Sequence, residues 1–146
     1  QKSLYAFSTI RRYASSLNVN AKSCRSKVVR CEVDNVFFLR RYFIERIKRI
    51  DNAEDIKIHC ADDIDTTAVV SVSFKTLDNA FVASALERDY SVMTRCGLHC
   101  SPLAHSSMGT YPEGTVRFSF SYFNTEEEID YTADAIQKIL KENNNA

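Results

Sequence analysis

Residues 114–140, GTVRFSFSYFNTEEEIDYTADAIQKIL, decide the fold class of this chain. The first part alternates apolar and polar side chains over residues 115–121, which predicts a strand with one polar face. Thr125 and Glu128 follow as a capping box, in which each side chain bonds the other's backbone N–H. The helix that they open carries apolar residues at helical spacing: Ile129, Ala133, Ile136 and Leu140. A strand followed by a helix that covers its apolar face indicates an α+β fold.

A helix and a β-hairpin are expected upstream of this stretch. Asp34 is a suitable N-cap for a helix that ends near Ile50 and keeps apolar residues on one side. Residues 56–60 alternate apolar and polar side chains, and residues 68–74 are rich in β-branched ones, so each stretch predicts a strand. The acidic residues 62–65 between them predict the turn of a hairpin.

A second helix and a long loop are expected between the hairpin and the final strand. Asp78 predicts the N-cap of this helix, and residues 91–94 predict a short strand after it. Residues 96–114 show no periodicity, and loops of that length are usually functional. The expected apolar face of the helix consists of Phe81, Val82, Ala85 and Leu86. From Asp34 onward the order is α-β-β-α-β-loop-β-α, which is a small, mainly antiparallel sheet with helices packed on it.

The charge divides the chain into two parts. The 146 residues have a net charge of zero, but residues 1–31 contain seven of the 19 basic side chains and no acidic one. We therefore expect a basic N-terminal segment at 1–33 and a domain at 34–146, with an amphipathic helix at 4–17 and a short strand at 27–33. The basic segment is either a surface segment or an organellar presequence. Because the chain begins with Gln, a processed product or an excised fragment is expected.

The composition also bears on partners and compartment. A zero net charge does not favour nucleic acid or an anionic membrane as the partner, and no apolar run reaches the roughly 18 residues that span a bilayer. Five cysteines are an odd number in a chain that does not need disulfides for stability. Reduced thiols and a cytoplasmic location are therefore expected.

Two thiols, two imidazoles and a guanidinium lie close together in residues 95–105, RCGLHCSPLAH. A structural zinc site is one interpretation, although the spacing matches no common zinc pattern. A nucleophilic cysteine is the second, since a nearby cation favours the thiolate. The third is that both cysteines are buried apolar residues and both histidines lie on the surface. The four potential zinc ligands are Cys96, His99, Cys100 and His105.

These residues also carry a resemblance to a known family. Together with Gly109-Thr110, residues 114–119 and residues 124–130, they resemble the C-terminal domain of cysteine desulfurase-like proteins. Those proteins belong to the class V aminotransferase family of pyridoxal-phosphate enzymes. The resemblance is specific over residues 92–130 and extends from about Val36 to Leu140. It implies the small C-terminal domain of a fold-type I enzyme.

The resemblance implies a role for five residues. Cys100 is in the position of the cysteine that attacks the sulfur of the substrate, leaving an enzyme persulfide and alanine. Arg117 is in the position of the arginine that binds the substrate carboxylate, and Arg95 lies at the edge of the same site. His99 and His105 belong to the active-site loop. The substrate of the full enzyme would be cysteine or selenocysteine, with a sulfinate left open.

The resemblance also implies what other parts of such an enzyme supply. The lysine that holds pyridoxal phosphate comes from a large domain, and no Ser-x-His-Lys segment occurs in this sequence. We therefore expect no cofactor-binding residue and no metal site in this chain, and no activity from it alone. The full enzyme is expected to form a homodimer and to pass sulfur to an acceptor protein. The alternative function is a sulfur carrier or interaction module that uses Cys100 without a cofactor.

Overall fold

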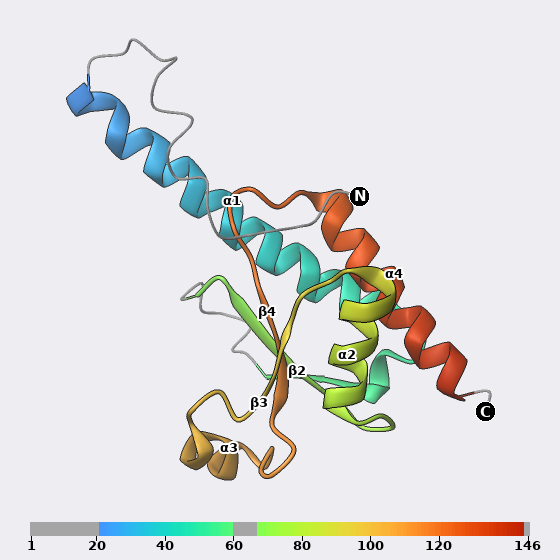
Figure 1. Cartoon of the computed structure of the whole chain (residues 1–146). Helices are drawn as coiled ribbons and strands as arrows, with labels where there is room; N and C mark the ends of the chain where they lie inside the picture. The colour runs from blue at the N-terminus through green and yellow to red at the C-terminus, as the bar shows by residue number, and fades with distance from the viewer. Residues whose placement is uncertain (1–20, 60–66, 145–146) are drawn as a thin grey trace.

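The computed structural model describes residues 21–59 and 67–144. A four-stranded antiparallel sheet forms its centre, in the order β1-β2-β4-β3 (Figure 1). The strands are β1 (Ile56–Ile58), β2 (Val69–Phe74), β3 (Arg95–Gly97) and β4 (Thr115–Ser119). The expected α+β class, the hairpin and the final strand are confirmed. The helix expected at 4–17 and the acidic turn at 62–65 lie outside the described residues.

Three long helices cover one face of this sheet (Figure 1). They are α1 (Ala21–Arg49), α2 (Asn79–Tyr90) and α4 (Glu126–Asn144). Alternate residues of β2 and β4 point toward them, so the sheet has one apolar and one polar face. The residues that meet in this core include Phe43, Leu86, Ile136, Val70, Val72 and Val116. The polar face of the sheet is left free of these helices.

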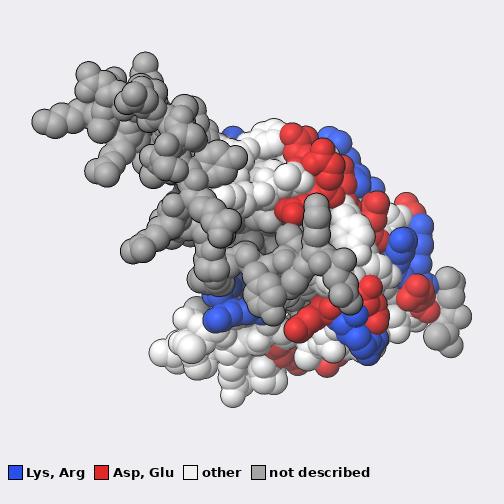
Figure 2. Space-filling model, turned by 45° about the horizontal axis from the view of Figure 1, so that its top comes forward, with Lys and Arg blue, Asp and Glu red and all other residues white. Residues whose placement is uncertain are grey.

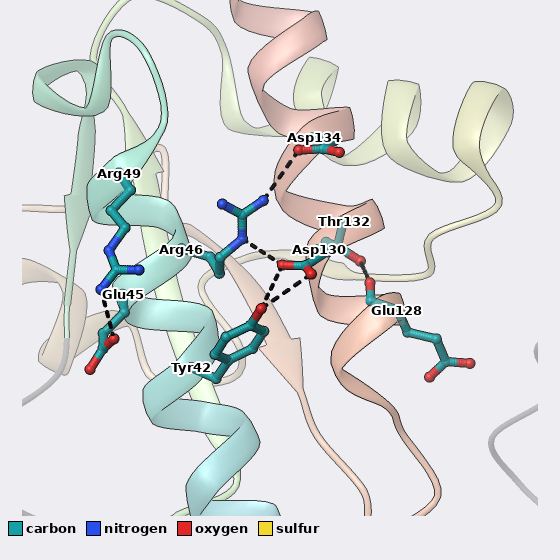
Figure 3. Close-up of polar contacts among 8 residues, drawn as sticks. All are labelled: Tyr42, Glu45, Arg46, Arg49, Glu128, Asp130, Thr132 and Asp134. Carbon is teal, nitrogen blue, oxygen red and sulfur yellow. Dashed lines mark hydrogen bonds and ion pairs between the residues drawn. The ribbon is translucent and has the colours of Figure 1, made fainter.

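Polar contacts join α1 to α4 at the rim of the core (Figure 3). The hydroxyl of Tyr42 donates to the carboxylate of Asp130 at 2.9 Å, and the Nε of Arg46 donates to the same carboxylate. Arg46 also reaches Asp134 at 3.4 Å. The Asp130 bond and burial raise the pKa of Tyr42. In Figure 2, acidic and basic side chains lie next to one another over the upper and right parts of the described surface, and the lower left part is mostly uncharged.

Two helix caps agree with the sequence. The carboxylate of Asp78 accepts a bond from the backbone N–H of Ala80 at 3.1 Å. At the start of α4, the N–H of Glu128 donates to the Thr125 hydroxyl and the N–H of Thr125 donates to the Glu128 carboxylate, each at 3.3 Å. These three bonds satisfy N–H groups that the start of a helix leaves without a partner.

The N-terminal part of α1 differs from expectation. The strand predicted at 27–33 is wrong, and so is the N-cap at Asp34, because one helix runs from Ala21 to Arg49. A short run containing β-branched residues fits a strand or a helix equally well, and once a helix has formed, extension by one residue is easier than a new start. The division into 1–33 and 34–146 stays a prediction.

Three details near the loop also differ. The strand predicted at 91–94 is wrong: Ser91 ends α2 with a positive φ of 56°, and pairing begins only at Arg95. The stretch 96–114 is not wholly irregular, because it contains helix α3 (Pro102–Met108). Phe81, expected on the apolar face of α2, is 43% exposed.

A 3-10 turn, η1 (Ala53–Asp55), connects α1 to β1.

Candidate functional site

Two arginines face each other on the polar side of the sheet. Arg95 on β3 is the register partner of Arg117 on β4, so both side chains leave the same face. Like charges directly opposite each other destabilise a sheet. The Nε of Arg117 is buried and has no hydrogen-bond partner among the described residues. An anion between the guanidinium groups would relieve the repulsion and bond this nitrogen, as a carboxylate does.

The thiol of Cys100 lies on a tight turn between β3 and α3. The N–H of Ser101 donates to the carbonyl of Leu98 at 2.8 Å, and the two central residues have positive φ angles, 48° at His99 and 63° at Cys100. This sign pattern is that of a type I′ turn, which normally contains Asn or Gly. Cys100 is a free, exposed thiol. The turn therefore presents it to solvent in a strained backbone.

His99 connects this turn to β4. Its Nε2 lies 3.1 Å from the carbonyl oxygen of Thr115 and 3.4 Å from the hydroxyl of the same residue. Thr115 is 1% exposed. Burial, and then the charge of Arg117, lower the pKa of His99, so its ring is neutral at pH 7. The turn of the thiol is thus bonded to the strand that carries Arg117.

His105 anchors α3 in a similar way. Its Nδ1 lies 2.7 Å from the hydroxyl of Thr110, and both residues are buried. The N–H of Thr110 also donates to the carbonyl of His105 at 2.9 Å, after Gly109 has ended the helix with a φ of 67°. The rings of His105 and His99 are 5.9 Å apart. The interpretation that placed both histidines on the surface is wrong.

A close backbone approach holds the ends of β3 and β4 together. A Cβ atom on Gly114 would overlap the backbone of Gly97, and Gly114 has a φ of 71°. Buried Asn79 supports the same corner: its amide donates to the carbonyl of Gly114 at 3.1 Å and accepts from the N–H of Phe74 at 3.0 Å. These bonds hold in place the start of the strand that carries Thr115 and Arg117.

The second thiol of the loop has a different position. Cys96 is the register partner of Val116, so it lies on the opposite side of β3 from Arg95. It is a free, exposed thiol, and burial, with the charge of Asp78, raises its pKa. The interpretation of both cysteines as buried apolar residues is therefore wrong. Among residues 21–59 and 67–144, no group of three or more His, Cys, Asp or Glu could hold a metal ion.

A cavity lies beside this arrangement and not in it. Its volume is about 440 Å³, and its lining includes Lys75, Asp78, Thr110 and Glu113. Neither Cys100 nor Arg117 lines it. It shares three residues with the supports of the site: Asn79, Thr110 and Gly114.

The sequence predicts five site residues, and the structure places them as strand partners, as chain neighbours or within electrostatic range of one another. Arg95 and Arg117 are register partners, His99 lies within electrostatic range of both arginines and of His105, and Cys100 follows His99 directly. Sequence reasoning missed the residues that hold these in place: Asn79, Thr110, Thr115 and Gly114. Thr110 and Thr115 each follow a glycine within the motif, and that pairing was the available signal.

The described residues do not fit a site for pyridoxal phosphate. A cofactor lysine must be held out of water so that its amine is nucleophilic. All the lysines whose side chains the structure describes are exposed: Lys48, Lys57, Lys75, Lys138 and Lys141. None of the helices in the described part of the chain has the length and apolar character that crossing a bilayer requires.

The chain is similar in sequence to one enzyme family. The model for aminotransferase class-V matches residues 39–132, more than half of the chain. A probable cysteine desulfurase of Borreliella burgdorferi is 23% identical over 96 residues, which cover 66% of this chain and 22% of that protein. One of Methanothermobacter thermautotrophicus is 31% identical over 72 residues, which cover 49% of this chain and 18% of that protein. The chain thus spans about a fifth of the length of these curated relatives.

Solved structures show the same fold. The apo cysteine desulfurase of Thermococcus onnurineus NA1 superposes with a TM-score of 0.70 at 23% identity, over 80% of this chain and 28% of that one. A cysteine desulfurase of Escherichia coli gives a TM-score of 0.64 at 18% identity, over 74% of this chain and 25% of that one. At these identities the likeness concerns the fold. The family model, which matches residues from α1 to α4, shows more: this chain belongs to the aminotransferase class-V family.

Proposed function

We propose that this chain is the C-terminal domain of a pyridoxal-phosphate-dependent cysteine desulfurase, in which Cys100 is the nucleophile. The observation that carries the proposal is the bond from His99 to Thr115, because it ties the turn of an exposed thiol to the strand of Arg117. A thiol that collects sulfur must be exposed and must be held near the group that binds the substrate.

Arg117 and Arg95 would bind the carboxylate of the substrate. A guanidinium forms two parallel bonds with a carboxylate, and the buried Nε of Arg117 lacks a partner among the described residues. The bound carboxylate would also offset the repulsion between the two register partners. The amino acid would then be held by its carboxylate, with its sulfur free to meet Cys100.

Cys100 would then take the sulfur. Its thiolate attacks the substrate sulfur, an S–S bond forms, and the C–S bond breaks, with the electron pair remaining on the substrate carbon. A proton added at that carbon completes alanine, and the enzyme keeps a persulfide. Pyridoxal phosphate, when bound, supplies the electron sink that makes this carbon a leaving group. An acceptor protein would afterwards remove the sulfur from the exposed turn.

The rest of such an enzyme would hold the cofactor. The described residues do not fit that role, and the chain spans about a fifth of its curated relatives. The full enzyme would work as a homodimer in the cytoplasm, where its thiols stay reduced. The chain alone, given pyridoxal phosphate and cysteine, should release no sulfide above the level of the Cys100→Ser variant. Sulfide turnover by the chain alone would contradict the proposal that another part of the enzyme holds the cofactor.

Arg95 and Arg117 together form what we call the carboxylate clamp. It can be tested without the cofactor. Iodoacetate and iodoacetamide alkylate a thiol by the same displacement of iodide, but only iodoacetate carries a carboxylate. We expect Cys100 to prefer iodoacetate several-fold more than Cys96 does, as measured by peptide mapping. Arg117→Gln should remove that preference, while Arg49→Gln, at an exposed ion pair with Glu45, should keep it. An unchanged preference in Arg117→Gln would contradict the clamp.

A sulfur carrier is the second candidate, and the exposure of Cys100 favours it because a carrier needs a reactive thiol and no cofactor. Alkylation rates of all five cysteines with iodoacetamide test it. A carrier requires Cys100 to react fastest by a wide margin. Equal rates at Cys24, Cys31, Cys60 and Cys100 would exclude the carrier.

A further inference from the structure

We propose that His99 is a positioning residue, which holds the turn of Cys100 against β4 through the bond from its Nε2 to Thr115. The inference rests on the proposed function, since it assigns to His99 the task of keeping the nucleophile beside the carboxylate clamp. It starts from the backbone of the turn, where His99 and Cys100 both have positive φ angles. Residues other than glycine adopt that conformation at a cost, because their Cβ atom crowds the following carbonyl oxygen. A turn with this strain needs a bond from outside to keep its shape.

The bond to Thr115 meets that need. The acceptor is a backbone carbonyl, which has no proton to give, so the Nε2 of His99 carries the hydrogen. In the neutral ring that places the free lone pair on Nδ1. Since Nε2 keeps its hydrogen when the ring is protonated, the bond is present in both states. The anchor therefore does not depend on pH, although the charge near Arg117 does.

The place of the acceptor gives the bond its significance. Thr115 is the register partner of Gly97, the last residue of β3, and lies two residues before Arg117. Thr115 is only 1% exposed, so the packing around it keeps its carbonyl in place if the loop moves. His105 fixes the far end of the loop through Thr110. Cys100 is thus the exposed apex of a segment fixed on both sides, and His99 is the fixed point nearest to the thiol.

Two variants of His99 distinguish the effect of losing the hydrogen bond to Thr115 from the effect of losing the imidazole ring. The amide nitrogen of Gln takes the place of Nε2, so His99→Gln keeps the donor to Thr115. The amide of Asn reaches only to the place of Nδ1, so His99→Asn loses that donor. Asn also tolerates a positive φ, so His99→Asn adds no backbone strain to the turn. Each variant removes the ring and adds no charge.

The first measurement is the ratio of the iodoacetate and iodoacetamide rates at Cys100. We expect His99→Asn to lower it by about two- to tenfold, the range expected from one hydrogen bond, while His99→Gln stays close to the parent chain. Given a parent chain that prefers iodoacetate at Cys100, the same ratio in both variants as in the parent would overturn the inference.

The second measurement does not involve the clamp. The N–H of Ser101, which donates to Leu98 within the turn, should exchange with solvent about two- to tenfold faster in His99→Asn than in His99→Gln. Equal exchange in the two variants would overturn the positioning role. If the parent chain showed no preference for iodoacetate but exchange still separated the variants, the clamp would be wrong and the positioning role would stand.

Discussion

At the scale of single residues, the site shows features that cost stability in an ordinary domain. Arg95 and Arg117 repel each other across the sheet, and His99 and Cys100 adopt a backbone conformation that their side chains disfavour. Such costs persist where the surrounding structure enforces them, as the buried Thr115 does here. They mark the same residues that the sequence motif had indicated.

The histidines predict how stability depends on pH. Burial is the main cause that lowers the pKa of both His59 and His99 from the ordinary value of 6.5. Below that value the unfolded chain binds protons that the folded chain does not, so the free energy of unfolding should fall as the pH drops from about 7 to 5. Above pH 7 these two groups contribute no pH dependence.

Urea unfolding at pH 7.5 and pH 5.5 measures this effect. The double variant His59→Gln/His99→Gln should lose less stability between these two values than the parent chain, because it lacks both groups. Asp51 and Asp89 have lowered pKa values, starting from 3.8, and titrate below this range. An equal loss in the parent chain and the double variant would show that the histidines are not responsible.

Some residue roles could be predicted from the sequence and others could not. Cys100 and Arg117 lie in a motif whose residue types and order are specific. The supports of the site are not visible in this way, because His99 meets a carbonyl 16 residues away and every residue has a carbonyl. Asn79 bonds the carbonyl of Gly114, which lies 35 residues later in the chain. No local sequence pattern indicates this contact.

At the scale of elements, the contact between the ends of β3 and β4 makes a sharp prediction. A Cβ on Gly114 would overlap the backbone of Gly97, whereas a Cβ on Gly109 meets nothing within 4 Å. Both glycines have positive φ angles, so Ala is strained at each by about 1 kcal/mol. Gly114→Ala should therefore lower the free energy of unfolding by clearly more than Gly109→Ala, measured by urea titration. Equal losses would mean that the two strand ends are not in contact.

The elements themselves were predictable where a periodic pattern was long or a cap was specific. Helix α4 with its capping box, β2 in the stretch rich in β-branched residues, and β4 in the alternating stretch are all confirmed. The pattern failed at residues 27–33 and 91–94. In the first the helix continued through β-branched residues, and in the second Ser91 turned the chain before the strand began.

At the scale of the whole molecule, the extent of the described core bears on where the domain begins. Among residues with described side chains, the core begins at Leu39 and ends at Leu140. A chain that starts at Asp34 should therefore unfold cooperatively, with a melting temperature within a few degrees of that of the full chain. Loss of cooperative unfolding after removal of residues 1–33 would show that the basic segment belongs to the fold.

The arrangement of the helices on the sheet explains why this chain would supply only part of an active site. Its three long helices cover one face of the sheet and leave the other free of them (Figure 1). Arg95 and Arg117 lie on that other face as register partners, and the turn of Cys100 directly follows β3. A site on an open sheet face needs a second body to exclude water and to supply the cofactor. We expect that body to be the cofactor-binding domain of the full enzyme.

The most direct test of the central claim is to follow a sulfur atom onto Cys100. The full chain is mixed with cysteine persulfide, whose outer sulfur a thiolate can take, and the modified peptides are identified by mass spectrometry. We predict that one added sulfur appears first on Cys100 itself, that Cys100→Ser abolishes this fast addition, and that Arg117→Gln slows it. Sulfur that adds equally to all five cysteines, or at an unchanged rate in Cys100→Ser, would contradict the assignment of Cys100 as the nucleophile.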